Sequence, residues 1–291
     1  MRKDEIQSND RNLKFKKIVF GEFMRVIIKK DYEECSVWAA NHIADAIKKF
    51  NPNEEKPFVI GLPTGSTPLG IYGKLAEKCR AKELSFKNVI SFNMDEYVGL
   101  APDNENSYRY FMNRNFFDLI DINKANTHLL DGCAADLEAE CENFEKMIAE
   151  SGGIKLFLGG IGNDGHLAFN EPGSSLTGRS HVQLLTEDTR SVNSRFFGGD
   201  ISKVPEKALT VGTGTICDAE EVLIIASGRA KACAVAAAVE GCVSQVWPVS
   251  VLQLHKNAVI VCDEAAAEEL RFKTVKYFME MENSGAEASF N

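Results

Sequence analysis

The chain has 291 residues, 44% of them hydrophobic and 26% charged, a balance typical of a globular protein with a substantial buried core. Its 42 acidic and 33 basic side chains give a net charge of −9, which opposes non-specific binding to nucleic acids and to anionic membrane surfaces. No apolar run reaches the length of about 18 residues that a transmembrane helix needs, so no membrane partner is expected.

Two further features concern the cellular compartment. Residues 1–23 are polar and mixed in charge and lack the apolar stretch of a secretory signal, so we expect a polar N-terminal extension and residence in the cytoplasm. The eight cysteines form no C-x-x-C pair and follow no regular spacing, which disfavours zinc sites and a disulfide framework.

Short β-rich apolar runs alternate with amphipathic stretches from residue 24 onward. Strands are predicted at residues 24–28, 58–62, 88–94, 154–159, 209–211, 222–226 and 258–262. Helices are predicted at residues 35–50, from Pro68 onward, at 137–151, at 229–241 and from 265 onward. This alternation predicts an α/β fold over residues 24–291, with a single open, mainly parallel, doubly wound sheet and helices on both faces.

The first unusual segment is the stretch from Pro63 to Pro68, where a strand gives way to a helix with Thr67 as the expected cap and Pro68 as the first helical residue. Backbone amides and hydroxyls at Thr64, Gly65, Ser66 and Thr67 suit a phosphate, because a helix N-terminus offers unpaired N–H donors. The Gly-Lys-Ser/Thr ending of a nucleotide P-loop is missing. An ordinary capped helix start remains the alternative.

The second segment follows the predicted strand 88–94, where Asp95 and Glu96 are adjacent. We expect both carboxylates to project into the crevice at the strand ends, where one of them serves as a general base. Abstraction of a carbon-bound proton next to a carbonyl suits a carboxylate that burial has made more basic. A simple Asp turn or cap is the alternative.

The third segment, residues 158–172, places His166 between Asp164 and Glu171 in a glycine-rich turn after an apolar strand. Imidazole titrates near neutrality and a neighbouring carboxylate fixes its tautomer, so the segment predicts a proton-transfer site. Residues 160–165 also match the dinucleotide fingerprint G-x-G-x-x-G, which needs a following helix. Pro172 and Gly173 disfavour that helix. A plain strand-exit turn is the other alternative.

The last stretch of interest, residues 174–200, is polar and rich in glycine, serine and threonine. It is a candidate lid over a site, and a static surface excursion explains it equally well. Arg195 within it, and Lys231 near the start of a predicted helix, are the cations placed to reach a bound anion, although most such side chains are solvated surface.

Taken together, residues 62–68, 92–99, 159–172 and 188–197 closely resemble the glucosamine-6-phosphate deaminase family in sequence, order and spacing. The resemblance extends from about Met24 to about Phe278 and covers nearly all of the expected catalytic domain. It implies conversion of glucosamine 6-phosphate and water into fructose 6-phosphate and ammonia, without a metal or an organic cofactor. It leaves the homo-oligomeric state open, because the family includes monomers and hexamers.

The resemblance also implies a role for each candidate residue. His166 would assist opening of the sugar ring, with Asp164 and Glu171 completing its proton-relay group, and Asp95 would move the proton from C2 to C1. The positions that match the family's phosphate site are Thr64, Gly65, Ser66, Thr67, Arg195 and Lys231.

One departure concerns regulation by N-acetylglucosamine 6-phosphate. Regulated relatives have basic side chains at the positions of His181 and Gln183, so weak or absent activation is expected here. Three rival functions remain, namely another phosphosugar isomerase, a phosphogluconate lactonase and a sugar-phosphate sensor without turnover. The complete set of acid and base residues favours the deaminase.

Overall fold

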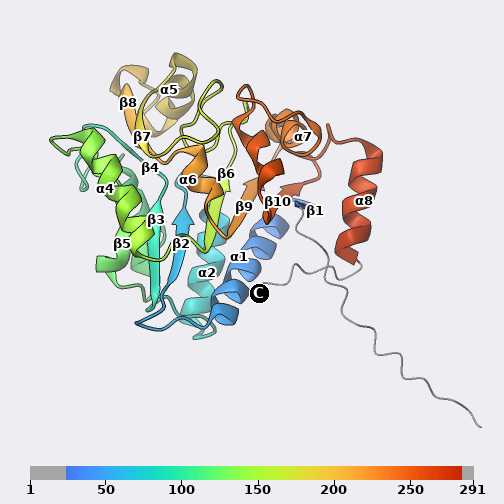
Figure 1. The fold of residues 1–291 in the computed structure, drawn as a ribbon, viewed down its shortest axis with the longest axis horizontal. Coiled ribbons are helices and arrows are strands. Elements are labelled where there is room, and N and C mark those ends of the chain that lie inside the picture. The colour runs from blue at the N-terminus through green and yellow to red at the C-terminus, as the bar shows by residue number, and fades with distance from the viewer. Residues whose placement is uncertain (1–23, 284–291) are drawn as a thin grey trace, which may run out of the picture.

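The structure is a computed structural model, and it describes residues 24–283. The extension predicted for residues 1–23 lies outside the described residues. The main sheet has seven strands in the order β1-β10-β9-β6-β2-β3-β5, and every neighbouring pair is parallel (Figure 1). Its strands are β1 (Arg25–Lys29), β2 (Phe58–Leu62), β3 (Val89–Asn93), β5 (Thr127–His128), β6 (Leu156–Gly160), β9 (Glu221–Ala226) and β10 (Ala258–Asp263).

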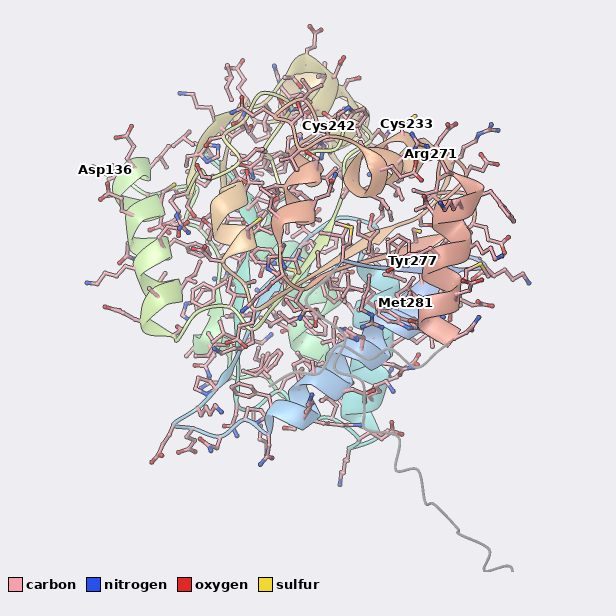
Figure 2. All side chains as sticks on the ribbon, turned by 45° about the vertical axis from the view of Figure 1, so that its right-hand side comes forward. Asp136, Cys233, Cys242, Arg271, Tyr277 and Met281 are labelled. Carbon is pink, nitrogen blue, oxygen red and sulfur yellow. The ribbon has the colours of Figure 1, made fainter. Side chains whose placement is uncertain are left out.

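The longer helices flank this sheet. They are α1 (Tyr32–Phe50), α2 (Leu69–Arg80), α3 (Tyr108–Asn115), α4 (Leu137–Glu150), α7 (Ala232–Glu240) and α8 (Phe272–Asn283). Figure 2 shows Asp136, which caps α4 by accepting backbone hydrogen bonds from Glu138 and Ala139, on the opposite side of the molecule from Tyr277 and Met281 of α8. Among the helices of residues 24–283, none is long and apolar enough to cross a membrane.

Alternation along the strands creates two hydrophobic cores, one on each face of the sheet. In β9, Val222 and Ile224 belong to one core, whereas Leu223 and Ile225 belong to the other. The first core contains side chains of α4 and α7, and the second contains those of α1, α2 and α3. Strands that are buried on both faces are typical of doubly wound sheets, so the predicted fold class is confirmed.

A second, smaller sheet has the order β4-β8-β7 and is antiparallel. It consists of β4 (Asp95–Tyr97), β8 (Lys207–Thr210) and β7 (His181–Leu184), and with α5 (Glu187–Asn193) it occupies the top of the view in Figure 1. Only β8 overlaps a predicted strand. The other two are only three and four residues long; β4 is polar, and the alternation of polar and apolar residues in β7 is too short to stand out in a sequence.

Several predicted helix starts differ from the observed ones. Helix α1 begins at Tyr32 rather than residue 35, and α7 begins at Ala232 after a 3-10 turn at residues 229–231. The helix expected from residue 265 onward begins at Phe272, because residues 264–270 form turns in which the Asp263 carboxylate accepts a hydrogen bond from the Ala266 N–H. Helix α2 begins at Leu69 with Pro68 as its cap residue, and Thr67 makes no capping hydrogen bond.

Candidate active site

The site segments follow four strands that are neighbours in the sheet. In the order β9-β6-β2-β3, these strands lead to Lys231, to the loop of Asp164 and His166, to Thr64–Thr67 and to Asp95. On one side of this point the chain order runs outward through β2, β3 and β5, and on the other side it runs outward through β6, β9 and β10. Such a switch point between adjacent parallel strands is where open α/β sheets bind ligands.

A cavity of about 570 Å³ lies at this switch point. The predicted site residues that line it are Thr64, Gly65, Ser66, Thr67, Asp95, Asp164, His166, Arg195 and Lys231. Glu171 is the predicted site residue that does not line it. The volume of the cavity falls within the usual range for small-molecule sites. It is large enough for a hexose phosphate.

The loop after β2 forms one end of the cavity. Gly65 has a φ of +94°, a conformation that glycine adopts without strain. Tyr32, from the start of α1, donates a hydrogen bond through its hydroxyl to the Thr67 carbonyl (2.9 Å) and accepts one from the Gly70 N–H (2.9 Å). The tyrosine therefore supplies the cap predicted for Thr67, so the hydroxyls of the loop stay available to an anion.

Two cations face the same cavity. Lys231 is the cap residue of α7 and follows a turn at Gly228, whose N–H donates to the Asp263 carboxylate at 3.0 Å. Burial lowers the pKa of Lys231; the nearby Asp164 carboxylate acts in the opposite direction, and the Arg195 guanidinium lowers it further. Lys231, Arg195 and Asp164 all line this cavity. A phosphate held by both cations would offset their mutual repulsion.

Asp95 is held at the point where the chain leaves the main sheet. The preceding residue, Met94, donates its N–H to the Leu62 carbonyl (3.1 Å) and accepts from the Val211 N–H (2.8 Å). Asp95 is 7% exposed, and its buried Oδ1 has no hydrogen-bond partner in the described residues. Burial, and next the charge of Glu96, raise the pKa of Asp95 well above its usual value. The carboxylate is therefore unusually basic.

The neighbouring Glu96 points away from the cavity, so the prediction that both carboxylates share one crevice is wrong. Its side chain accepts the backbone N–H groups of Tyr97 (2.8 Å), Tyr108 (2.9 Å) and Arg109 (3.0 Å). Two of these donors belong to the first turn of α3, which has no intrahelical acceptor for them. Glu96 therefore fixes α3 against β4. Of the two adjacent carboxylates, Asp95 is the one that faces the cavity.

His166 and Asp164 form a close pair. His166 Nδ1 lies 2.7 Å from Asp164 Oδ1, and hydrogen bonding to the imidazole keeps the pKa of Asp164 below its usual value. Nδ1 makes no hydrogen bond of regular geometry within residues 24–283, so it is the short contact with Asp164 that occupies this side of the ring and leaves Nε2 for a ligand.

The glycines of this loop allow the pair to form. A Cβ at Gly162 would lie 2.2 Å from His166 Nδ1, and one at Gly165, whose φ is +81°, would lie 2.6 Å from Trp247 Cε3. Residues 161–180, which follow β6, form turns, bends and one isolated bridge, and contain no helix. The dinucleotide alternative is therefore wrong, since it requires a helix N-terminus behind the glycines.

Glu171 contacts the candidate lid. Its Oε1 accepts a hydrogen bond from the Thr186 hydroxyl (3.1 Å) and a shorter one from the Thr189 hydroxyl, both at the start of α5. The hydrogen bonds and ion pairs found within residues 24–283 include none between Glu171 and His166. Glu171 thus links the histidine loop to the segment 174–200, and its place in a proton relay stays a prediction.

Tyr97 and Tyr108 were not predicted, and both line the cavity beside Asp95. The signal for Tyr97 is present in the sequence, because residues two apart on a strand share a face. Tyr32 carries no such signal, since it reaches the site from 35 residues away in the chain.

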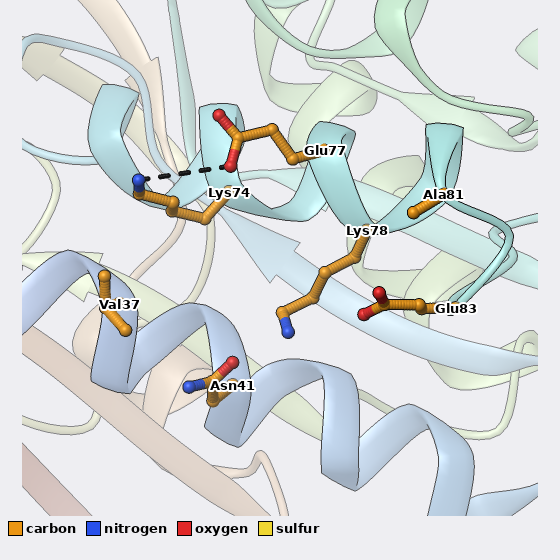
Figure 3. Close-up of a pocket in the computed structure, with 7 residues that line it drawn as sticks. All are labelled: Val37, Asn41, Lys74, Glu77, Lys78, Ala81 and Glu83. Carbon is orange, nitrogen blue, oxygen red and sulfur yellow. Dashed lines mark ion pairs between the residues drawn. The ribbon is translucent and has the colours of Figure 1, made fainter.

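A second hollow, of about 290 Å³, lies between α1 and α2 (Figure 3). It contains none of the predicted site residues. Of its two lysines, Lys74 is paired with Glu33 (2.9 Å) and Glu77 (4.0 Å), and Lys78 shares the hollow with the carboxylates of Glu77 and Glu83. The hollow therefore offers no comparable anion site.

The sequence matches the family described as glucosamine-6-phosphate isomerases and 6-phosphogluconolactonase over residues 30–261. A glucosamine-6-phosphate deaminase of Treponema denticola is 59% identical over 91% of this chain and 98% of its own length. One of Phocaeicola vulgatus is 58% identical over 90% of this chain and 99% of its own length.

Solved structures agree with these similarities. The chain resembles a monomeric glucosamine-6-phosphate deaminase with a TM-score of 0.81 and 41% identity, covering 84% of this chain and all of the other. It also resembles a 6-phosphogluconolactonase of Trypanosoma cruzi, with a TM-score of 0.69 but 20% identity, over 87% of this chain and 99% of the other. The latter likeness shows a shared fold.

Proposed function

Because this chain belongs to the glucosamine-6-phosphate isomerase and 6-phosphogluconolactonase family, we infer that it is an enzyme that converts glucosamine 6-phosphate and water into fructose 6-phosphate and ammonia. The observation that carries this conclusion is the arrangement of two separate acid/base groups, Asp95 and the Asp164–His166 pair, around one cavity with a cationic end. Relatives that are more than half identical are glucosamine-6-phosphate deaminases.

The first chemical step is opening of the pyranose ring. His166, oriented through Nδ1 by Asp164, can move a proton between the ring oxygen and O1 through Nε2. The phosphate, held by Thr64–Thr67 with Lys231 and Arg195, would anchor the far end of the sugar. Anchoring restricts the open chain to a reactive orientation, which contributes several kcal/mol in favourable cases.

The second step is transfer of a carbon-bound proton. Asp95 takes the proton from C2 and returns it at C1, which gives an iminium at C2 that water hydrolyses to the ketone and ammonia. A carboxylate whose pKa is raised by burial is matched to this work, because basicity near the working pH favours proton abstraction.

A lactonase is the rival suggested by the shared fold, and it would hydrolyse a lactone without a base acting on carbon. The direct test is to incubate the protein with glucosamine 6-phosphate and to assay both ammonia and fructose 6-phosphate, with 6-phosphogluconolactone as the alternative substrate. Ammonia and fructose 6-phosphate in equal amounts support the proposal. Lactone hydrolysis alone, or binding without turnover, would overturn it.

Removal of the half-buried cation should weaken substrate binding. The Lys231→Ala variant loses a charge-assisted hydrogen bond to phosphate, worth about 1.5–3 kcal/mol, so the KM for glucosamine 6-phosphate should rise roughly 10- to 150-fold with a much smaller change in kcat. Arg229, which is 81% exposed at its side chain and paired with Glu268, provides the matched control. A Lys231→Ala enzyme whose KM equals that of Arg229→Ala would contradict the phosphate role.

Activation by N-acetylglucosamine 6-phosphate should be weak or absent. His181 and Gln183 contact each other (Nε2 to Oε1, 3.2 Å), and their remaining polar atoms face the carbonyls of Arg179 and Leu184 at 2.8 Å. Neither provides a fixed cation for a phosphate. Initial rates measured against glucosamine 6-phosphate should follow the same curve with and without micromolar effector. A sigmoidal curve that the effector makes hyperbolic would refute this.

The remaining assignments are also proposals. We propose that residues 24–291 act as one catalytic domain, that 174–200 serve as its lid, and that Glu171 joins the proton relay when the substrate is bound. The hydrogen bonds from Thr186 and Thr189 to Glu171 support the link between lid and site. Residence in the cytoplasm is supported by the eight cysteines, all of them free thiols. The homo-oligomeric state is left to measurement.

A further inference from the structure

Strand β4 places a tyrosine beside the proposed base. Side chains alternate between the two faces of a strand, so Asp95 and Tyr97 share a face while Glu96 lies on the other. The contacts agree, because Asp95 and Tyr97 both line the cavity whereas Glu96 binds the start of α3.

The Tyr97 hydroxyl is buried and makes no hydrogen bond of regular geometry within residues 24–283, although the Tyr108 hydroxyl and the Asn193 side chain lie near enough to influence its pKa. The residue is 1% exposed. A buried hydroxyl without a partner costs free energy, on the order of 1–3 kcal/mol, and such a cost is offset when a ligand supplies the missing partner. The hydroxyl is therefore placed for a polar atom that arrives in the cavity.

Three aromatic rings hold Tyr97 in place. Its ring centroid lies 4.8 Å from that of Tyr108, 5.6 Å from Phe197 and 6.0 Å from Phe169. Burial is the main reason that the pKa of Tyr97 rises to about 12. The hydroxyl thus keeps its proton at neutral pH, which makes it a fixed donor with little freedom to turn elsewhere.

We propose that Tyr97 is a further catalytic residue, whose hydroxyl donates a hydrogen bond to O1 of the open-chain sugar while Asp95 takes the proton from C2. This inference rests on the function proposed above. O1 is the suitable acceptor because it is two bonds from C2, the carbon that Asp95 must reach. The amine on C2 offers no lone pair to a donor while it is an ammonium group.

The electron count explains why a donor is needed at O1. When the C2–H bond breaks, its electron pair forms the C1–C2 double bond, and the π pair of the C1 carbonyl moves onto O1. Asp95 then gives its proton to C1. The proton that O1 gains is balanced by the one that nitrogen loses in passing from ammonium to iminium. A fixed donor at the developing oxyanion lowers the barrier to the first of these transfers.

The test is the Tyr97→Phe variant, which keeps the ring and removes the donor. The kcat for ammonia release should fall about 100-fold, the effect of losing one such donor, while the KM and inhibition by inorganic phosphate stay as in the wild type. With substrate deuterated at C2, the primary isotope effect on kcat should be at least as large as in the wild type, because C–H cleavage becomes the slow step.

Tyr72→Phe is the matched control. Tyr72 is fully buried, and its hydroxyl donates to the Pro63 carbonyl at 2.5 Å without lining the cavity. This variant should lower the Tm and leave the isotope effect unchanged. A structural role for Tyr97 would likewise lower the Tm of Tyr97→Phe while its kcat and isotope effect stayed as in the wild type, and this result would overturn the inference.

Two outcomes would overturn the inference. One is a Tyr97→Phe enzyme that keeps the wild-type kcat. The other is a variant whose kcat falls while its isotope effect collapses toward unity, since a step other than C–H cleavage would then be slowed. A wild-type protein that releases no ammonia from glucosamine 6-phosphate would instead overturn the proposed function, so the two failures are distinguishable.

Discussion

Replacement of Asp95 by asparagine is expected to lower the kcat for ammonia release by about 10⁴-fold, the upper range for loss of a positioned general base. Asparagine preserves the shape of the side chain but cannot take a proton from C2. Competitive inhibition by inorganic phosphate should remain, because Lys231 and Arg195 are unchanged in this variant. Turnover within tenfold of the wild type would end the assignment of Asp95 as the base.

The same variant should be more stable than the wild type above mildly acid pH. The folded state holds the Asp95 proton more tightly than the unfolded state does, because the pKa of the folded form is raised well above 3.8. This contribution to stability is fully present below the unfolded value and is lost as the pH rises through the folded value. Asparagine does not ionise, so its advantage should appear only above about pH 4.

Urea unfolding at several pH values would measure this difference. The free energy of unfolding should be similar for the two proteins near pH 3 and should diverge as the pH rises, in favour of Asp95→Asn. In the wild type, the acid limb of the kcat/KM profile should also lie at higher pH than an ordinary carboxylate would give. Equal stability at all pH values would contradict the burial argument.

Replacement of His166 by glutamine is expected to lower kcat by about 10³-fold, within the range for loss of one acid/base group. Glutamine can still form hydrogen bonds but cannot carry a proton between the ring oxygen and O1. Ring opening should then limit turnover, so the primary isotope effect from C2 should fall toward unity. That is the opposite of the result expected for Tyr97→Phe.

Asp164→Asn provides the comparison for this second prediction. The imidazole would remain, without the ionised partner that faces Nδ1, and the loss in kcat should be smaller than for His166→Gln. If His166→Gln kept its full isotope effect, ring opening would not be the step that His166 serves.

Much of the site could be predicted because strand ends are visible in the sequence. The apolar runs before Pro63, Asp95 and the histidine loop mark three strands, and parallel strands bring their carboxyl ends to one edge. The positions of Asp164 and His166 then follow from local chain geometry. Seven of the nine predicted residues that line the cavity come from these three segments; Lys231 follows a fourth strand, β9, and Arg195 belongs to the polar segment 174–200.

The remainder depends on contacts that a sequence pattern does not record. Glu96 and Asp95 are adjacent carboxylates, and only the position of α3 shows that Glu96 binds backbone amides there. The cap of α2 comes from Tyr32 on another helix. Glu171 was expected near His166, but its hydrogen bonds run to threonines of α5. Each case is a tertiary contact that overrides a local preference.

The position of β1 in the sheet has a consequence for synthesis of the chain. Within residues 24–283, this first strand pairs with β10 alone, so that Arg25 lies opposite Val259. During synthesis, β1 therefore leaves the ribosome long before its partner strand β10 has been made. Pairing of the two strands must also close the long loop of chain between them, which is slow. Until residue 263 has emerged, the hydrophobic side chains of β1 have no strand to join, which is the interval when such a segment is prone to aggregate. Truncations before β10 should therefore yield insoluble protein, even though the predicted site residues all precede that strand.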